Sequence, residues 1–259
     1  MEAACRRGWF EIGFAIQSPI LYSTESSRAA IRISVAAILS ITSLGAAKRI
    51  ALAANIKAVN LGCGVTVAPG WINIDNSPNA RLSKFPRLRR LLWKTGVLSD
   101  QHYSVPWEKN ILIHDLRNRL PFADCSIDYV YTSHVLEHLA VTDARKLIKE
   151  VFRILKPEGM VRLVVPDLAY GARRYLDGLA TNPSDPKAAP EFINWLQLSR
   201  PGVRDPHLWM YDAPSLSAVL TEAGFTNTAV CEHKQGRVPD CAVLDGRPDE
   251  SLHIEAEKR

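Results

Sequence analysis

A pair of glycines and a carboxylate further along the chain are the residues whose spacing first suggests chemistry. The apolar run Val59-Asn60-Leu61 leads into Gly62-Cys63-Gly64, and a second apolar run ends at Asp75. Glycine lets the backbone approach a ligand closely because no Cβ stands in the way. A carboxylate at the end of the next strand can accept two hydrogen bonds from a ribose diol. The pattern predicts a nucleoside pocket whose cofactor side includes Asn60, Gly62, Cys63, Gly64 and Asp75.

The residues after the second glycine narrow the kind of nucleoside. A dinucleotide site needs a third glycine that opens a helix beneath a pyrophosphate. Here Gly64 is followed by Val65-Thr66-Val67, and no Lys-Ser or Lys-Thr pair follows to hold a phosphate. The spacing therefore favours a nucleoside without phosphates and disfavours a nicotinamide-dependent reductase.

Two longer segments extend the pattern. They read PFADCSIDYVYTSHVLEHL from Pro121 to Leu139 and KEVFRILKPEGMVRLVVPDL from Lys149 to Leu168. These segments resemble class I S-adenosylmethionine (SAM) dependent methyltransferases, and are most similar to a bacterial group with LPF-x-D-x-S-x-D, VLEHL and LKPGG-like motifs. The resemblance covers the chain from Ile56 to Phe225. It implies SAM as cofactor and a role in the assembly of cell-surface polysaccharide.

Alternating strands and helices predict an α/β fold. We expect a Rossmann-like open, mostly parallel seven-stranded sheet with helices on both faces and the ligand at the carboxyl ends of the strands. Residues 1–54 would form an N-terminal extension with a helix, and residues 55–259 the methyltransferase domain. The expected strands are Lys57 to Leu61, Trp71 to Ile74, Ile111 to His114, Tyr129 to Thr132, Val161 to Val165, Thr226 to Cys231 and one after Asp240.

Local signals place the turns between these strands. Only a short loop, Val65 to Gly70, follows the first strand, where most class I methyltransferases have a helix, so the N-terminal helix would build that wall. Thr142 or Asp143 should cap a helix that runs to Leu155. The remaining expectations are a turn at Pro157-Glu158-Gly159, a loop from Ser184 to Pro190, and a helix from Ser215 to Ala223 that stops at Gly224.

Three more residues are expected on the cofactor side. The resemblance implies that Asp115, after the third strand, contacts adenine and that Leu116 packs on the ring. Asp115 could instead cap a turn. We also assign Ser133, at the end of the fourth strand, to this side of the pocket.

The acceptor side is expected to contain His134, Glu137 and His138. Spacing of i, i+3 and i+4 would put the three on one face of a helix after the fourth strand. Asp167, after the fifth strand, and His207, in the segment HLWMYD, are expected nearby as catalytic candidates. The cluster could supply a general base, bind a divalent metal as Glu-x-x-Glu-His does in some similar enzymes, or be structural. We assign no metal ligand.

Composition fits a soluble globular protein. The chain has 259 residues, 47% hydrophobic and 23% charged, with a net charge of +5, and its five cysteines are scattered without a C-x-x-C pair. This favours reduced thiols in a cytoplasm. The uncharged stretch from Ile33 to Ala47 is too short for a spanning helix, and Arg6-Arg7 lacks the apolar core of an export signal.

The segment from Arg81 to Lys94 holds six basic residues and no acid. It is interpreted first as a surface helix with a solvated basic face, and otherwise as a peripheral contact with the inner face of the membrane or with a phosphorylated substrate. No recognition module for nucleic acid is visible.

Three functions remain open from the residues and the resemblance together. The first is a SAM-dependent methyltransferase that acts on a small or sugar-like acceptor. The second is a metal-assisted O-methyltransferase of a prenylated or nucleic-acid substrate. The third is a non-catalytic SAM-binding protein, against which the intact face of His134, Glu137 and His138 argues.

Overall fold

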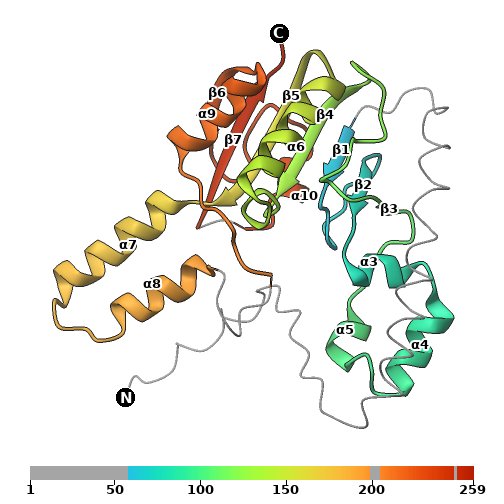
Figure 1. The fold of residues 1–259 in the computed structure, drawn as a ribbon, viewed down its shortest axis with the longest axis horizontal. Coiled ribbons are helices and arrows are strands. Elements are labelled where there is room, and N and C mark those ends of the chain that lie inside the picture. Colours follow the sequence, from blue (N-terminus) through green and yellow to red (C-terminus); the bar gives the residue numbers. More distant parts are fainter. Residues whose placement is uncertain (1–57, 199–204, 248–249) are drawn as a thin grey trace.

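The computed structural model describes residues 58–198, 205–247 and 250–259. These residues form a seven-stranded sheet of order β3-β2-β1-β4-β5-β7-β6 (Figure 1). The strands are β1 (Ala58–Leu61), β2 (Ile72–Asp75), β3 (Leu112–Ile113), β4 (Ile127–Ser133), β5 (Leu155–Pro166), β6 (Thr226–Cys231) and β7 (Ser251–Glu257). Only β7 runs against its neighbours, since it pairs antiparallel with both β5 and β6. The predicted open, mostly parallel α/β sheet is confirmed.

Helices cover both faces of this sheet. Two long helices, α6 (Val141–Ile154) and α9 (Ala213–Ala223), lie on one face, and the short α10 (Cys241–Leu244) lies on the other (Figure 1). The larger core lies beneath α6, which buries Leu147, Ile148 and Val151 at helical spacing. On the second face, Trp71, Tyr131 and Leu244 belong to a separate buried cluster.

Two groups of helices extend from the carboxyl edge of the sheet. The first follows β2 and contains α3 (Pro78–Ser83), α4 (Pro86–Lys94) and α5 (Asp100–Ser104). The second is a hairpin of α7 (Leu168–Thr181) and α8 (Ala188–Leu196), which projects away from the sheet (Figure 1). The hairpin is closed by Gly171 against Trp195 and by the stacked rings of Tyr175 and Phe192, whose centroids are 5.0 Å apart. Both groups leave the sheet edge where the predicted pocket lies.

Several sequence expectations need correction. The residues Pro157–Gly159, which were predicted to form a turn, lie within β5. They form a bulge there, since Ile127 of β4 pairs with Leu155 whereas Tyr129 pairs with Met160. Helix α6 begins after Ala140 with no side-chain cap, so Thr142 and Asp143 fall inside its first turn. The predicted 184–190 loop is shortened because α8 already begins at Ala188.

Other expectations are confirmed. No helix separates β1 from β2 in the described chain, and α9 ends at Gly224, which adopts a left-handed φ of 104°. The expected N-terminal helix and the 33–47 stretch lie outside the described residues. Within the described ranges, no helix is long and apolar enough to cross a bilayer.

Candidate active site

The loop between β1 and β2 is fastened by the carboxylate of Asp75. Gly64 N donates to Asp75 Oδ2 at 2.9 Å, and Ser77 N donates to Asp75 Oδ1 at 2.7 Å. Asp75 is almost buried, and Cys63 N donates to Ile74 O at 2.9 Å in the same turn. Each carboxylate oxygen has a second lone pair, so Asp75 retains acceptors for a ribose diol while it holds the loop. These residues fit the nucleoside part of SAM.

Gly62 is required by its backbone and by its neighbour. Its φ is 68°, a left-handed value that L side chains adopt at a cost. A Cβ at this position would overlap Val135 Cγ2. The glycine therefore lets the β1 turn pack against the residue that follows His134, so it links the cofactor side to the acceptor side.

Asn60 and Cys63 support the loop from within. The Asn60 amide donates to Thr66 O at 2.9 Å and to Asn73 Oδ1 at 3.2 Å, and the residue is buried. Burial, with the nearby charge of Asp75, raises the pKa of the Cys63 thiol. Asn60 therefore holds the turn through two hydrogen bonds, and the Cys63 thiol contacts Gly64 O at 3.4 Å.

The remaining predicted cofactor residues follow β3 and β4. Arg117 donates to the Asp115 carboxylate through Nε at 2.9 Å and through its backbone N at 3.0 Å. This hydrogen bonding holds the pKa of Asp115 below its usual range. The carboxylate thus closes a turn in this structure, which is the alternative that the sequence left open. Leu116 packs against the main core, and Ser133 is the last residue of β4.

The prediction that His134, Glu137 and His138 lie on one face of a regular helix is wrong. The prediction that their side chains lie together is confirmed. His134 adopts a left-handed φ of 54°, and Leu136–His138 form one turn of 3-10 helix, η1, before α6 begins. His134 Nδ1 nevertheless lies 3.1 Å from Glu137 Oε1, and His138 Nε2 lies 3.9 Å from the same oxygen. A tight turn therefore brings together the side chains that a regular helix was expected to align.

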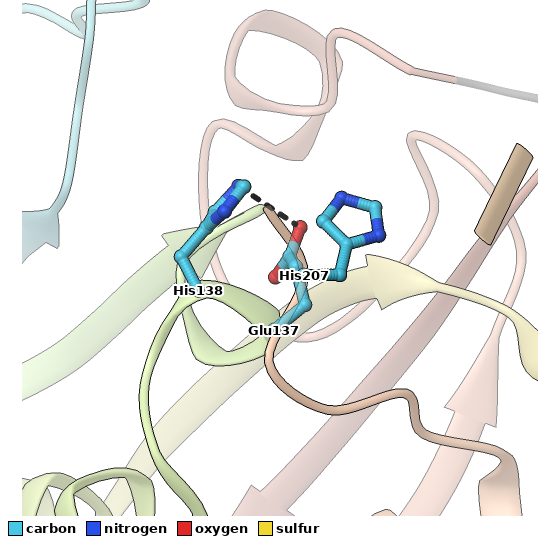
Figure 2. Close-up of side chains that lie close together, drawn as sticks. All are labelled: Glu137, His138 and His207. Atoms are coloured by element: carbon cyan, nitrogen blue, oxygen red, sulfur yellow. Dashed lines mark ion pairs between the residues drawn. The ribbon is translucent and has the colours of Figure 1, made fainter. Parts of the chain in front are cut away.

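His207 joins this cluster from a distant segment. Leu208 N donates to Glu137 O at 2.6 Å, and His138 Nδ1 lies 3.2 Å from Pro206 O. The rings of His138 and His207 meet edge to face at 5.1 Å between centroids. Figure 2 shows Glu137 between the two imidazoles, and one potential ligand atom from each of the three residues lies within 4.8 Å of the others.

Glu137 has unusual electrostatic surroundings. Its side chain is fully buried, and among the described residues neither carboxylate oxygen has a hydrogen-bond partner of good geometry. Burial opposes its ionisation, but the close His134 imidazole and the charge of His138 outweigh burial and hold the pKa of Glu137 below its usual value. Burial lowers the pKa of His207 and, with the Glu137 charge, raises that of Tyr211 to about 12. A buried carboxylate beside several imidazoles is suited to proton transfer or to metal binding.

Asp167 does not join the cluster. It is the N-cap of α7, where its carboxylate accepts from Ala169 N at 3.0 Å and lies 3.8 Å from Arg173. These partners give it a structural role at the start of the hairpin.

Two residues near the cluster were missed from the sequence. Ser251 Oγ lies 3.1 Å from His134 Nε2, and burial lowers the pKa of Arg247 against the opposing effect of the nearby Glu137 charge. Ser251 reaches this edge only because β7 runs antiparallel to β5. No local signal in the sequence indicates that reversal.

A family model described as a methyltransferase domain matches residues 1–230. Among curated proteins, no match to this chain is found.

Solved structures that are similar include three SAM-dependent methyltransferases. One from Thermotoga maritima is 16% identical, with 90% of this chain and 96% of that chain covered and a TM-score of 0.42. One from Methanosarcina mazei is 18% identical, with 82% and 96% covered and a TM-score of 0.43. One from Archaeoglobus fulgidus is 12% identical, with 89% and 94% covered and a TM-score of 0.42.

The family match defines the class of protein. The chain belongs to the methyltransferase-domain family. It is a SAM-dependent methyltransferase with the seven-stranded sheet predicted from its sequence.

Proposed function

We propose that this enzyme methylates a hydroxyl of a small or sugar-like acceptor, with the Glu137 cluster as its acceptor-side base. The observation that carries the proposal is a fully buried Glu137 carboxylate with three imidazoles around it. The bound cofactor supplies an already activated methyl group, so the protein mainly positions the acceptor and removes its proton.

His138 has the hydrogen-bond pattern of a base. A backbone carbonyl can only accept, so the contact with Pro206 O assigns the proton of a neutral His138 to Nδ1. Its Nε2 then carries the lone pair, and its side chain is 36% exposed, which leaves it open to an acceptor. The imidazolium that forms on proton transfer would be stabilised by Glu137 at 3.9 Å.

Both ring nitrogens of His134 have a close polar neighbour. Its Nδ1 lies 3.1 Å from Glu137 Oε1 without the alignment of a hydrogen bond, and its Nε2 lies 3.1 Å from the Ser251 hydroxyl. This arrangement fixes the ring and orients the Glu137 carboxylate. We therefore assign His134 to positioning and His138 to proton removal.

The acceptor is proposed from the side chains beside the cluster. Leu208 and Trp209 directly follow His207, are 47% and 49% exposed, and both donate their backbone N–H to Glu137 O. Exposed indole beside a base suits the apolar face of a sugar ring. A role in cell-surface polysaccharide assembly has its support in the sequence resemblance, and a cytoplasmic location in the free cysteines of the described chain.

A metal-assisted reaction on a prenylated or nucleic-acid acceptor is the second candidate. The ligand atoms of Glu137, His138 and His207 lie within 4.8 Å of one another, and His207 Nδ1 has no hydrogen-bond partner among the described residues. His207 takes the place of His134 in this set, because its ligand atom lies within 4.8 Å of those of Glu137 and His138. Two imidazoles and a carboxylate suit Zn²⁺ or Mn²⁺.

One set of assays separates these candidates. The acceptor is first identified as the unmethylated compound that accumulates in cells lacking the gene. With that acceptor, a base mechanism predicts activity that survives chelation and a rate that rises with pH through one histidine-type ionisation. A metal mechanism predicts loss on chelation and recovery with added Zn²⁺ or Mn²⁺. SAM binding without turnover on any compound that accumulates would instead support a non-catalytic protein.

A further inference from the structure

Helix α4 presents a cationic face to its surroundings. Arg87, Arg90, Leu91 and Lys94 are exposed, and helical periodicity puts these four on one side. Within the structure as described, no residue forms an ion pair or hydrogen bond with the side chain of Arg87, Arg90 or Lys94. We call the four residues the α4 face.

The opposite side of α4 is firmly packed. Leu92 is buried, and Arg89 donates to the backbone carbonyls of His102, Tyr103 and Val105. The rings of Trp93 and Tyr103 stack at 4.4 Å with planes 8° apart. The helix is therefore held against α5, and the α4 face is a fixed surface.

This face lacks the opposite charges that usually balance a solvated helix. Residues 78–99 contain no Asp or Glu, and the next acid, Asp100, accepts from Trp93 Nε1 at 2.6 Å. Arg87 and Arg90 are spaced i, i+3, and Arg90 and Lys94 are spaced i, i+4, so the like charges repel along the helix. An external anion would relieve that repulsion.

Exposed apolar side chains among the cations indicate the kind of anion. Leu91 is 56% exposed within the α4 face, and Val97 is 53% exposed just beyond the helix. A hollow of about 420 Å³ lined by Lys84, Phe85, Pro86, Arg87 and Leu88 opens at the start of α4. Cations that flank apolar side chains fit the interface of a bilayer, where phosphate lies above hydrocarbon.

We propose that the α4 face docks this enzyme on membranes rich in anionic phospholipid. The proposal is independent of the methyl acceptor. Docking there would hold the carboxyl edge of the sheet near the bilayer, since α3 begins directly after Ser77, whose backbone contacts Asp75.

Flotation of the full chain with vesicles tests the proposal. We expect binding to phosphatidylcholine vesicles that contain phosphatidylglycerol, and none to phosphatidylcholine alone. Changing Arg87, Arg90 and Lys94 together to Gln should weaken binding about a hundredfold, at about fivefold per cation. A matched variant with Lys149, Lys187 and Lys234 changed to Gln removes the same charge from exposed positions elsewhere and should bind like the wild type.

A second variant distinguishes lipid from other polyanions. Leu91→Asn keeps every charge, so it should weaken vesicle binding severalfold and leave retention on heparin unchanged. Equal binding of the wild type and the α4 triple variant to the mixed vesicles would overturn the proposal. Retention of the wild type on heparin or RNA without vesicle binding would also overturn it, in favour of a soluble polyanion.

Discussion

The two sides of the active site differ in how their polar groups are satisfied. On the cofactor side, Asp75 accepts from two backbone N–H groups and Asn60 makes two hydrogen bonds within the loop. On the acceptor side, both oxygens of the buried Glu137 lack a well-aligned donor among the described residues. A buried polar group without a partner costs stability, so its retention indicates function. The comparison implies a preformed cofactor loop beside a reactive acceptor cluster.

The largest effect is expected at Glu137. The change Glu137→Gln removes the buried charge with almost no change of shape. The base His138 then loses the anion that stabilises its protonated form, so turnover should fall by about a hundredfold or more. The affinity for SAM should stay within about twofold, because catalytic groups act on the transition state. Calorimetry and steady-state assays with the identified acceptor measure the two quantities. Glu222→Gln, at an exposed carboxylate of α9, is the control.

Asp75 should show the opposite behaviour. Asp75→Ala removes the anchor of Gly64 N and Ser77 N together with the acceptors of two ribose hydrogen bonds. At about 1.5 kcal/mol or more for each hydrogen bond to a charged group, the Kd for SAM should rise by at least roughly a hundredfold. Titration calorimetry measures it, and Asp177→Ala on the exposed side of α7 is the control. Unchanged affinity in Asp75→Ala would remove the basis for separating the two sides.

Gly62 connects the two sides and should respond in stability. A side chain added at Gly62 would meet Val135 and not open ligand space, so we expect it to lower the stability of the fold. Gly62→Ala should cost about 1 to 3 kcal/mol of unfolding free energy, the usual range for overpacking. Urea unfolding of Gly62→Ala, Val135→Ala and the double variant measures the coupling. If the effects simply add, the contact across the site carries no energy.

The smallest effect is expected at Asp167. As the N-cap of α7, Asp167→Ala should cost about 1 kcal/mol, whereas Asp167→Asn should be nearly neutral because Asn caps as well as Asp. Thermal unfolding compares the two variants. Turnover should be the same in both. A loss of turnover in Asp167→Asn, which keeps the helix cap, would show that the carboxylate is catalytic.

The cofactor side was predictable because its signals are local. Gly62, Gly64 and Asp75 end two adjacent parallel strands, and their types alone indicate the turn. The acceptor side depends on longer connections. Local spacing grouped His134 with Glu137 and His138, but the left-handed φ of His134 replaces the expected helix face with a tight turn.

Contacts far apart in the chain explain most of what was missed. Ser251 reaches His134 through the antiparallel β7, which sequence periodicity does not reveal. His207 was expected nearby, but its approach to Glu137 depends on backbone hydrogen bonds between segments that are distant in sequence. The role of Asp167 could have been found, since an Asp directly before a helix is a common N-cap signal.

Amide hydrogen exchange with and without S-adenosylhomocysteine tests the central claim most directly. The claim is that the nucleoside binds against the loop that Asp75 fastens, beside the Glu137 cluster. We expect the ligand to slow exchange in residues 62–77 and to leave α4 and the α7–α8 hairpin unchanged. Binding that protects other segments while residues 62–77 exchange at the same rate would contradict this account.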